Sequence, residues 1–212
     1  MLNKIQLEKI YFNFLNTFNS NCWIAGGAIT HVLLNCVPND IDIFFEDHDK
    51  RDRAVEKCLK DGYEVLTAGP RYIKLRDTKN IIPIMKPFDW NVSLEKRTRP
   101  SFFDAIVLED SPLKTIKKFD FTINQVAIDK NEKFYHLSSA LKDIQSKTLI
   151  INGKHPSNFS PNKAKLIIKN LRKGFTITNK ELNRLFESLP PNIDTSEDQI
   201  NWLVKYIIDY SR

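Results

Sequence analysis

Two carboxylates stand two residues apart in the segment Asp40-Ile41-Asp42-Ile43. Residues two apart in a β-strand share a face, so Asp40 and Asp42 point to one side and both isoleucines to the other. Carboxylates at this spacing repel each other unless a cation lies between them, and a divalent metal is the usual cation. The spacing therefore predicts a metal site on a strand.

A glycine pair precedes these acids, in the segment Gly26-Gly27-Ala28 that follows the apolar residues 22–25. A glycine pair that opens a helix leaves backbone N–H groups free to hold a phosphate. Thr30 could add a hydroxyl to such a phosphate site, or its hydroxyl could bond to its own helix backbone. A phosphate site next to a Mg²⁺ site is typical of a nucleotide enzyme.

Hydrophobic periodicity and turn residues predict the elements that position these groups. The predicted strands are 22–25, 40–45, 63–66, 72–75, 81–85, 102–108, 124–128 and 134–136. An opening helical stripe covers 5–18, and the other predicted helices are 28–34, 49–60, 112–118, 139–146, 162–173, 180–188 and 196–210. Strands and helices mix up to residue 150, and only helices follow. The pattern therefore predicts an α+β domain over 1–150 and a helical region over 151–212.

The composition fits an intracellular globular protein of 212 residues. No apolar run is long enough to span a membrane, and the beginning of the sequence has no signal-peptide pattern. Three cysteines without a CxxC spacing indicate free thiols, and they predict a cytoplasmic location. The net charge of +6 favours polyanionic partners only weakly. Basic residues gather in the last third of the chain, where they indicate either a solvated helix face or contact with nucleic acid.

Three segments in order resemble motifs of the nucleotidyltransferase superfamily, which has a polymerase-β-like fold. The glycine pair with Asp40-Ile41-Asp42 is the first, and Phe119–Ala127 (FDFTINQVA) is similar to the motif that lies against the incoming nucleotide. Lys165–Phe175 (KLIIKNLRKGF) resembles the basic neck helix. The likeness is to the head domain of CCA-adding enzymes and poly(A) polymerases, and to small bacteriophage-type nucleotidyltransferases, which is consistent with a phage or viral origin.

This resemblance implies a mixed-sheet catalytic domain and a two-ion Mg²⁺ site that uses an NTP as substrate. Asp40 and Asp42 would hold both ions, and a third carboxylate would come from a neighbouring strand. We expect Asp104 in this role, because it is one acid in the otherwise apolar strand Phe102–Val107. An acid at a strand edge that faces water is the alternative for Asp104.

The remaining nucleotide contacts are also implied by the resemblance. Gly26 and Gly27 would let the backbone approach the phosphates, and Asp120 and Asn124 would contact the sugar or base. Three basic residues share one helical face and would grip the triphosphate or an RNA backbone: Lys165, Lys169 and Arg172. Arg71, Lys74 and Arg76 lie on or near a strand beside this site, and a surface position suits them equally well.

The chain departs from the family at several positions. Thr30-His31 stands where the family usually has Arg-Asp, and Lys118-Phe119 replaces a pair of arginines. No Glu-Asp-x-x-Arg segment, which selects C and A in CCA-adding enzymes, is present, and the chain stops where their body and tail would begin. We expect an enzyme that adds NMP to a hydroxyl, with an RNA or tRNA end as acceptor. The alternative is an inactive nucleotidyltransferase-like module that binds RNA or serves in an assembly, and transfer to a protein side chain is a third possibility. Neither the NTP nor the oligomeric state follows from the sequence.

Overall fold

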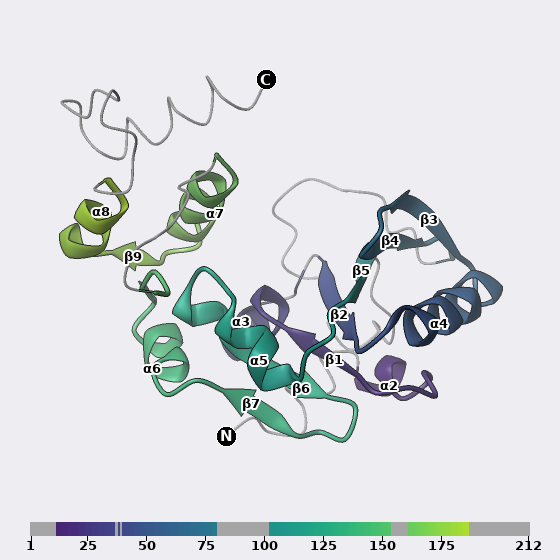
Figure 1. Cartoon of the computed structure of the whole chain (residues 1–212). Coiled ribbons are helices and arrows are strands. Elements are labelled where there is room, and N and C mark those ends of the chain that lie inside the picture. The colour runs from purple at the N-terminus through teal and green to yellow at the C-terminus, as the bar shows by residue number, and fades with distance from the viewer. Residues whose placement is uncertain (1–11, 37, 39, 80–101, 154–160, 187–212) are drawn as a thin grey trace. The chain divides into compact units, whose positions relative to one another are not determined.

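The computed structural model describes residues 12–36, 38, 40–79, 102–153 and 161–186 (Figure 1). The predicted α+β fold is confirmed, with a mixed sheet of seven strands and several helices. The predicted strand at 81–85 and the predicted helix at 196–210 lie outside the described residues, as do residues 5–11 of the opening helical stripe. Within the described ranges, no helix is long and apolar enough to cross a membrane.

The strands of the main sheet match the predicted strands to within a few residues. They are β1 (Cys22–Ala25), β2 (Ile41–Phe45), β3 (Tyr63–Ala68), β4 (Tyr72–Asp77), β5 (Phe102–Val107), β6 (Val126–Asp129) and β7 (Phe134–His136). Their order across the sheet is β3-β4-β5-β2-β1-β6-β7. β2 and β5 are parallel, and the other neighbouring strands are antiparallel. The two carboxylate-bearing strands therefore lie side by side in the middle of the sheet.

Helices α2 (Phe12–Leu15), α3 (Gly27–Leu33), α4 (His48–Lys60) and α5 (Pro112–Lys117) accompany this sheet. Local capping explains where two of them begin. The Asp47 carboxylate accepts the N–H of Lys50 at 2.8 Å at the start of α4. Ser111 accepts the N–H of Lys114 at 3.4 Å at the start of α5, with proline at the first helical position, as the sequence predicts.

An aromatic cluster packs α2 against one face of the sheet. The ring of Phe14 lies 5.4 Å from that of Phe103, and the ring of Phe18 lies 5.9 Å from that of Phe45. α4 packs on β2, β3 and β5 (Figure 1). Side chains alternate along a strand, so the opposite face of β2 and β5 carries Asp42 and Asp104. The buried aromatic face therefore fixes which way the two acids point.

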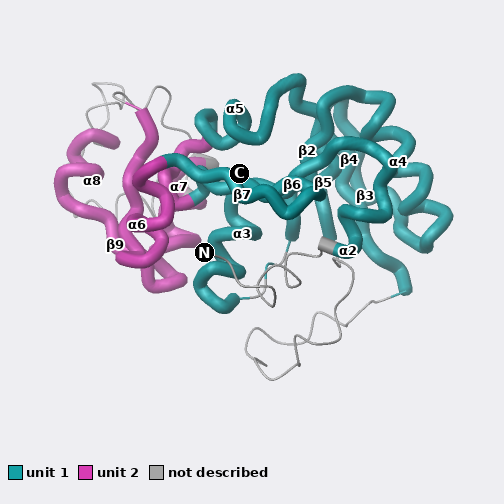
Figure 2. The backbone as a smooth tube through the Cα atoms, turned by 90° about the horizontal axis from the view of Figure 1, so that it is seen from below, with its two compact units in different colours: residues 1–118, 124–137 teal, residues 119–123, 138–212 magenta. Residues whose placement is uncertain are grey.

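The chain forms two compact units, coloured separately in Figure 2. The first contains residues 1–118 and 124–137, and the second contains residues 119–123 and 138–212. The sequence pattern places the boundary between the two regions at residue 150. In the structure, α6 (Ala140–Gln145) and β8 (Thr148–Leu149) precede that position and belong to the second compact unit. α7 (Pro161–Leu171) and α8 (Asn179–Phe186) match two further predicted helices of this unit. Between them β9 (Thr176–Ile177) pairs in parallel with β8, a contact that the helical pattern does not predict.

Candidate functional site

Asp42 and Asp104 are direct neighbours on adjacent strands. In the parallel pair of β2 and β5, Asp42 is opposite Asp104, and the flanking pairs are Ile41 with Phe103 and Ile43 with Ala105. Adjacent strands lie about 4.8 Å apart, so the two side chains leave the sheet close together on the same face. β5 lies between β4 and β2, and the edge position considered for Asp104 therefore does not apply.

Asp104 occupies a partly buried position, with 24% of its side chain exposed. Its Oδ2 lies 3.7 Å from the Nζ of Lys74, while its Oδ1 is buried and has no hydrogen-bond partner among the described residues. Burial raises the pKa of Asp104 above its ordinary value. The Lys74 ammonium lowers that pKa in part, and the negative charge of Asp40 raises it further.

Asp40 is exposed and lies one residue before β2. Its negative charge raises the pKa of Asp104, so these two acids lie near enough to interact. Across the part of the chain that the structure describes, no group of three or more His, Cys, Asp or Glu side chains is arranged to hold a metal ion. The cluster therefore consists of two carboxylates on adjacent strands, with Asp40 just before the start of β2.

The glycine pair forms a tight turn between β1 and α3. Gly26 has φ 81° and ψ −139°, a left-handed conformation that favours glycine, and its N–H donates to the carbonyl of Val126 at 2.9 Å. Gly27 begins α3, and a Cβ placed on it would meet no atom of the described residues within 4 Å. The backbone at Gly27 is therefore open to approach from outside, at a helix end whose first N–H groups have no partner within the helix.

Thr30 and Asn124 both belong to the first unit. Thr30 is buried, and its hydroxyl donates to the carbonyl of Gly26 at 3.3 Å, which is the backbone-bonded alternative considered above. Asn124 ends the short 3₁₀ helix η2 (Thr122–Asn124) just before β6, rather than beginning the strand as predicted. It is partly exposed.

Asp120 belongs to the second unit, where it pairs with a basic residue of α7. Its Oδ1 lies 3.0 Å from the Nζ of Lys163, and its backbone carbonyl accepts the N–H of Asn152 at 2.8 Å. The antiparallel bridge between Phe121 and Ile151 continues this contact. The motif segment 119–123 is thus anchored within the second unit.

The basic residues predicted on the neck-like helix lie in or just after α7. Lys169 and Arg172 are exposed, and Arg172 follows the last residue of the helix. The side chain of Lys165 lies outside the described residues. Lys169 and Arg172 are therefore available to an anionic ligand.

Lys74 is one of the three basic residues, with Arg71 and Arg76, for which the sequence allows either a place beside the site or a surface position. β4 pairs with β5 so that Lys74 is opposite Asp104, and the lysine thereby joins the carboxylate face. The alternation of Tyr72-Ile73-Lys74-Leu75 does identify its face, since Leu75 is fully buried. The register that brings it to Asp104 cannot be read from the sequence.

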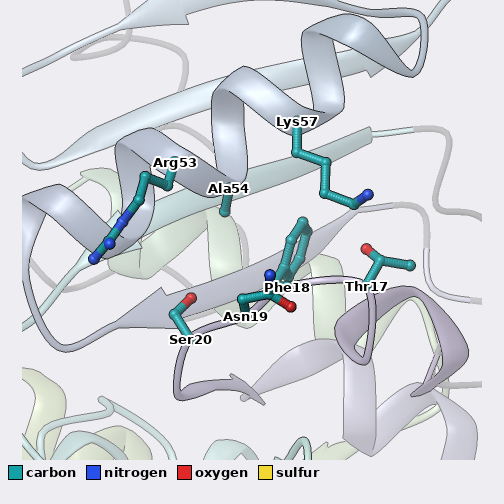
Figure 3. Close-up of a pocket in the computed structure, with 7 residues that line it drawn as sticks. All are labelled: Thr17, Phe18, Asn19, Ser20, Arg53, Ala54 and Lys57. Atoms are coloured by element: carbon teal, nitrogen blue, oxygen red, sulfur yellow. The ribbon is translucent and has the colours of Figure 1, made fainter.

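A separate hollow lies between the segment 17–20 and α4, with a volume of about 400 Å³ (Figure 3). Phe18 reaches from this segment toward α4, and the ammonium of Lys57 points toward Thr17 (Figure 3). Seven residues line the hollow: Thr17, Phe18, Asn19, Ser20, Arg53, Ala54 and Lys57. None of the predicted site residues is among them.

Solved structures with a similar fold include CCA-adding enzymes and a tRNA nucleotidyltransferase. A Thermotoga maritima CCA-adding enzyme complexed with tRNA matches with a TM-score of 0.64 and 15% identity, over 99% of this chain and 48% of that one. A tRNA nucleotidyltransferase complexed with a primer tRNA and an incoming ATP analog matches with a TM-score of 0.57 and 16% identity, over 95% and 60%. An apo CCA-adding enzyme matches with a TM-score of 0.59 and 17% identity, over 87% and 42%. The predicted nucleotidyltransferase-like fold is confirmed, and this chain spans only about half the length of these structures.

No curated protein matches the sequence. A family model described as "Gabija anti-defense 2 family protein" (Gad2) matches residues 1–147. This match covers more than half of the 212 residues, including both central carboxylate strands. The chain, with its nucleotidyltransferase-like fold, belongs to the Gabija anti-defense 2 family.

Proposed function

We propose that this chain is a Mg²⁺-dependent nucleotidyltransferase that transfers NMP from an NTP to a hydroxyl acceptor, namely an RNA or tRNA end. One observation supports this proposal above the others. Asp42 and Asp104 are direct neighbours on the central strands, and Oδ1 of Asp104 is buried without a hydrogen-bond partner among the described residues. A buried carboxylate oxygen of this kind is costly unless a cation or proton donor completes it.

The donor chemistry of the cluster suits Mg²⁺. Mg²⁺ prefers oxygen ligands and is commonly held by one or two carboxylates together with substrate phosphates. Asp42 and Asp104 supply such carboxylates from neighbouring strands, and Asp40 lies near enough to act on the charge of Asp104. In this proposal these three residues hold the metal, and the triphosphate supplies the remaining oxygens.

In the proposed reaction, the acceptor oxygen forms a bond to the α-phosphorus while the bond from that phosphorus to pyrophosphate breaks. Bound Mg²⁺ would neutralise charge on the phosphate oxygens and lower the pKa of the attacking hydroxyl. Asp104 would bind the metal and help to deprotonate the attacking hydroxyl, which is the role that the resemblance implies for the third carboxylate. The proton would pass to water when the product leaves.

The other predicted residues would position the two substrates. The open backbone at Gly27 would admit the β- and γ-phosphates beside the turn at Gly26. In this proposal Asp120 and Asn124 would contact the sugar or base of the nucleotide, as the resemblance implies. Lys169 is exposed on α7, and with Lys165 and Arg172 of the same predicted face it would contact a triphosphate or an RNA backbone.

Two facts guide the choice of acceptor. Similar solved structures hold tRNA or a primer tRNA, which supports an RNA acceptor. The family description concerns a defence named Gabija, so NMP transfer onto an RNA or protein of that defence would connect the chemistry with the family. NTPs and RNA are intracellular substrates, and we therefore place this activity in the cytoplasm.

Label transfer from NTPs tests the proposal. Purified protein would be incubated with each α-³²P-labelled NTP, Mg²⁺ and total RNA, and the products would be divided by nuclease and protease digestion. The test variant is Asp40→Ala/Asp42→Ala. The matched control is Asp49→Ala/Glu56→Ala, which removes two exposed acids from α4 and changes the net charge equally.

We expect nuclease-sensitive label with the wild type and the control, and none with the test variant. Protease-sensitive label with the same dependence on Asp40 and Asp42 would replace the RNA acceptor with a protein acceptor. Absence of label with every NTP, from protein whose circular dichroism shows a folded chain, would contradict the enzyme. That result would favour the alternative of an inactive module that binds RNA.

A further inference from the structure

Lys74 places a positive charge inside the carboxylate cluster. Its Nζ lies 3.7 Å from Oδ2 of Asp104, and the exposed fractions of the two side chains are 34% and 24%. Asp104 is the only ionic partner that Lys74 has among the described residues. A pair of this kind is partly withdrawn from solvent, so it is screened less than an ion pair on the open surface.

The strand register makes this contact a consequence of the fold. β5 lies between β4 and β2, and Asp104 faces Lys74 on one side and Asp42 on the other. Leu75 and Phe103, the next pair along, are both buried in the core on the opposite face. A shift of one residue would bury Lys74, so the packing of Leu75 holds the lysine on the carboxylate face.

The two carboxylate oxygens of Asp104 have different surroundings. Oδ2 faces the lysine, whereas the buried Oδ1 has no hydrogen-bond partner in the described part of the chain. The distance of 3.7 Å is also longer than a hydrogen bond, so the lysine balances the charge without completing the carboxylate. Oδ1 is therefore the carboxylate oxygen of Asp104 that the lysine leaves without a partner among the described residues.

We propose that Lys74 is a resident counter-cation that stabilises the metal-free carboxylate cluster and thereby weakens its affinity for a divalent metal ion. This inference rests on the proposed function, because it takes Asp42 and Asp104 as metal-binding residues. Without a metal, the ammonium offsets the repulsion among the carboxylates. When a divalent cation binds, the same ammonium lies beside two additional positive charges and opposes them.

The consequence is that the site fills readily only when an NTP brings its own negative charge. The triphosphate would offset both cations, so Lys74 couples metal binding to nucleotide binding. A cluster without this lysine would hold a divalent metal in the absence of nucleotide. Lys74 is thus a positioning residue, which acts on the metal through Asp104.

Mn²⁺ binding in the absence of nucleotide tests this role. Free Mn²⁺ would be measured by electron paramagnetic resonance during titration of the wild type, Lys74→Met and Lys74→Arg. Methionine keeps an unbranched apolar side chain but removes the charge, and arginine keeps the charge. The control is Lys60→Met, which removes an exposed lysine from α4 and changes the net charge equally.

We expect Lys74→Met to bind Mn²⁺ about tenfold more tightly than the wild type, because one repelling charge is gone from the site. Lys74→Arg and Lys60→Met should stay within about twofold of the wild type, because each leaves a charge beside Asp104. A second measurement is the thermal unfolding midpoint. In EDTA, Lys74→Met should unfold at a lower temperature than the wild type, and Mn²⁺ should raise its midpoint more.

Two results together would overturn this inference but leave the proposed metal site intact. Lys74→Met would bind Mn²⁺ no more tightly than the wild type, and Asp42→Asn would still lose Mn²⁺ binding. The metal site would then stand without the counter-cation. Absence of Mn²⁺ binding by the wild type and every lysine variant would instead overturn the proposed metal site, and the inference with it. If Lys74→Met does not fold, Lys74→Gln takes its place, with the same expected direction.

Discussion

Neighbouring groups shift the pKa of Asp104 in opposite directions. Burial raises its pKa most, the charge of Asp40 adds to that rise, and the Lys74 ammonium acts in the opposite direction. The result is a carboxyl whose proton affinity exceeds that of an exposed aspartate, on a strand next to a second acid. This combination is typical of a functional site, because a structural core would be more stable with an apolar residue there.

Removing only the charge of Asp104 separates its chemical role from its structural one. We expect Asp104→Asn to lower the rate of NMP transfer by about 10²–10⁴-fold. Stability should stay near that of the wild type, since asparagine has a similar volume and relieves the desolvation of a charge. Transfer rates from labelled NTP and urea unfolding would measure the two effects. Glu56→Gln, an exposed acid on α4, serves as the control, and transfer at the wild-type rate by Asp104→Asn would contradict the assignment.

The cysteines give a second test at this scale. Burial raises the pKa of the Cys22 thiol from 9.0 to about 12, with Lys130 lowering it and Asp129 raising it by smaller amounts. The folded chain keeps a proton that the unfolded chain loses above pH 9, so this contribution to stability is complete below pH 9 and lost as the pH rises toward 12.

At pH 9, iodoacetamide should therefore alkylate Cys36, which is partly exposed, before the buried Cys22 and Cys58. Mass spectrometry of peptides after short exposures would give the order. In urea all three cysteines should react at comparable rates. Early labelling of Cys22 in the folded protein would show that β1 is less protected than its packing indicates.

At the scale of elements, the turn from β1 into α3 offers two adjacent glycines with different constraints. Gly26→Ala should destabilise the fold by about 1–3 kcal/mol, because its φ of 81° strains any side chain. Gly27→Ala should leave stability unchanged or raise it by up to about 1 kcal/mol, because its Cβ would meet open space at the start of a helix. Urea unfolding would compare the two.

The same pair also tests the phosphate contact. Gly27→Ala adds a methyl group where the backbone is open, so we expect weaker binding of NTP by a folded protein. Isothermal titration with a non-hydrolysable NTP would measure it. Unchanged affinity in Gly27→Ala would mean that the phosphates do not approach this turn.

In the second unit, Glu181 joins α8 to the segment after β8. It is buried, accepts the N–H of Ile151 at 2.9 Å, and pairs with Arg184 at 2.9 Å through both of its oxygens. Glu181→Ala leaves that N–H and the arginine without this partner, and should cost about 2–4 kcal/mol of local stability. Hydrogen exchange at residues 148–151 and 179–186 should accelerate, while β2 and β5 in the first unit should keep their protection. Glu181→Gln, which retains an acceptor, should lose less.

The sequence predicts elements and faces better than it predicts partners. Alternation alone places Asp104 among apolar residues and Asp42 between isoleucines, so a common face could be expected. That their strands are neighbours was expected only from the resemblance, and the register that sets Asp104 opposite Asp42 and Lys74 depends on packing across the sheet. For the same reason the sequence could not bring Lys74 to Asp104 or Lys163 to Asp120. Thr30 was undecided because a helical threonine can bond to its own backbone or outward.

At the scale of the whole molecule, the chain passes between its units more than once. Residues 119–123 belong to the second unit, although residues on both sides of them belong to the first. A boundary based on composition falls where strands give way to helices, near residue 150. The bridge from Phe121 to Ile151 and the pairing of β8 with β9 explain why the second unit already includes α6 and β8.

The contribution of the net charge of +6 to RNA binding can be tested at this scale, because each contact with an RNA phosphate releases counterions and makes the affinity depend on salt. Lys169 and Arg172 are exposed at the end of α7 and would each contact a phosphate in the proposed complex. Lys169→Gln/Arg172→Gln should weaken RNA binding and reduce the magnitude of the slope of log K against log salt by about 1.4 for a single strand. Filter binding over a range of salt concentrations would measure both.

The control for this prediction is Lys60→Gln/Lys114→Gln, which removes two exposed lysines from α4 and α5 of the first unit and changes the net charge equally. If RNA is attracted only by the overall charge, both double variants should weaken binding alike and leave the slope nearly unchanged. If the end of α7 makes phosphate contacts, only Lys169→Gln/Arg172→Gln should change the slope. Equal slopes in all three proteins would therefore remove α7 from the acceptor surface and leave its basic residues as a solvated helix face.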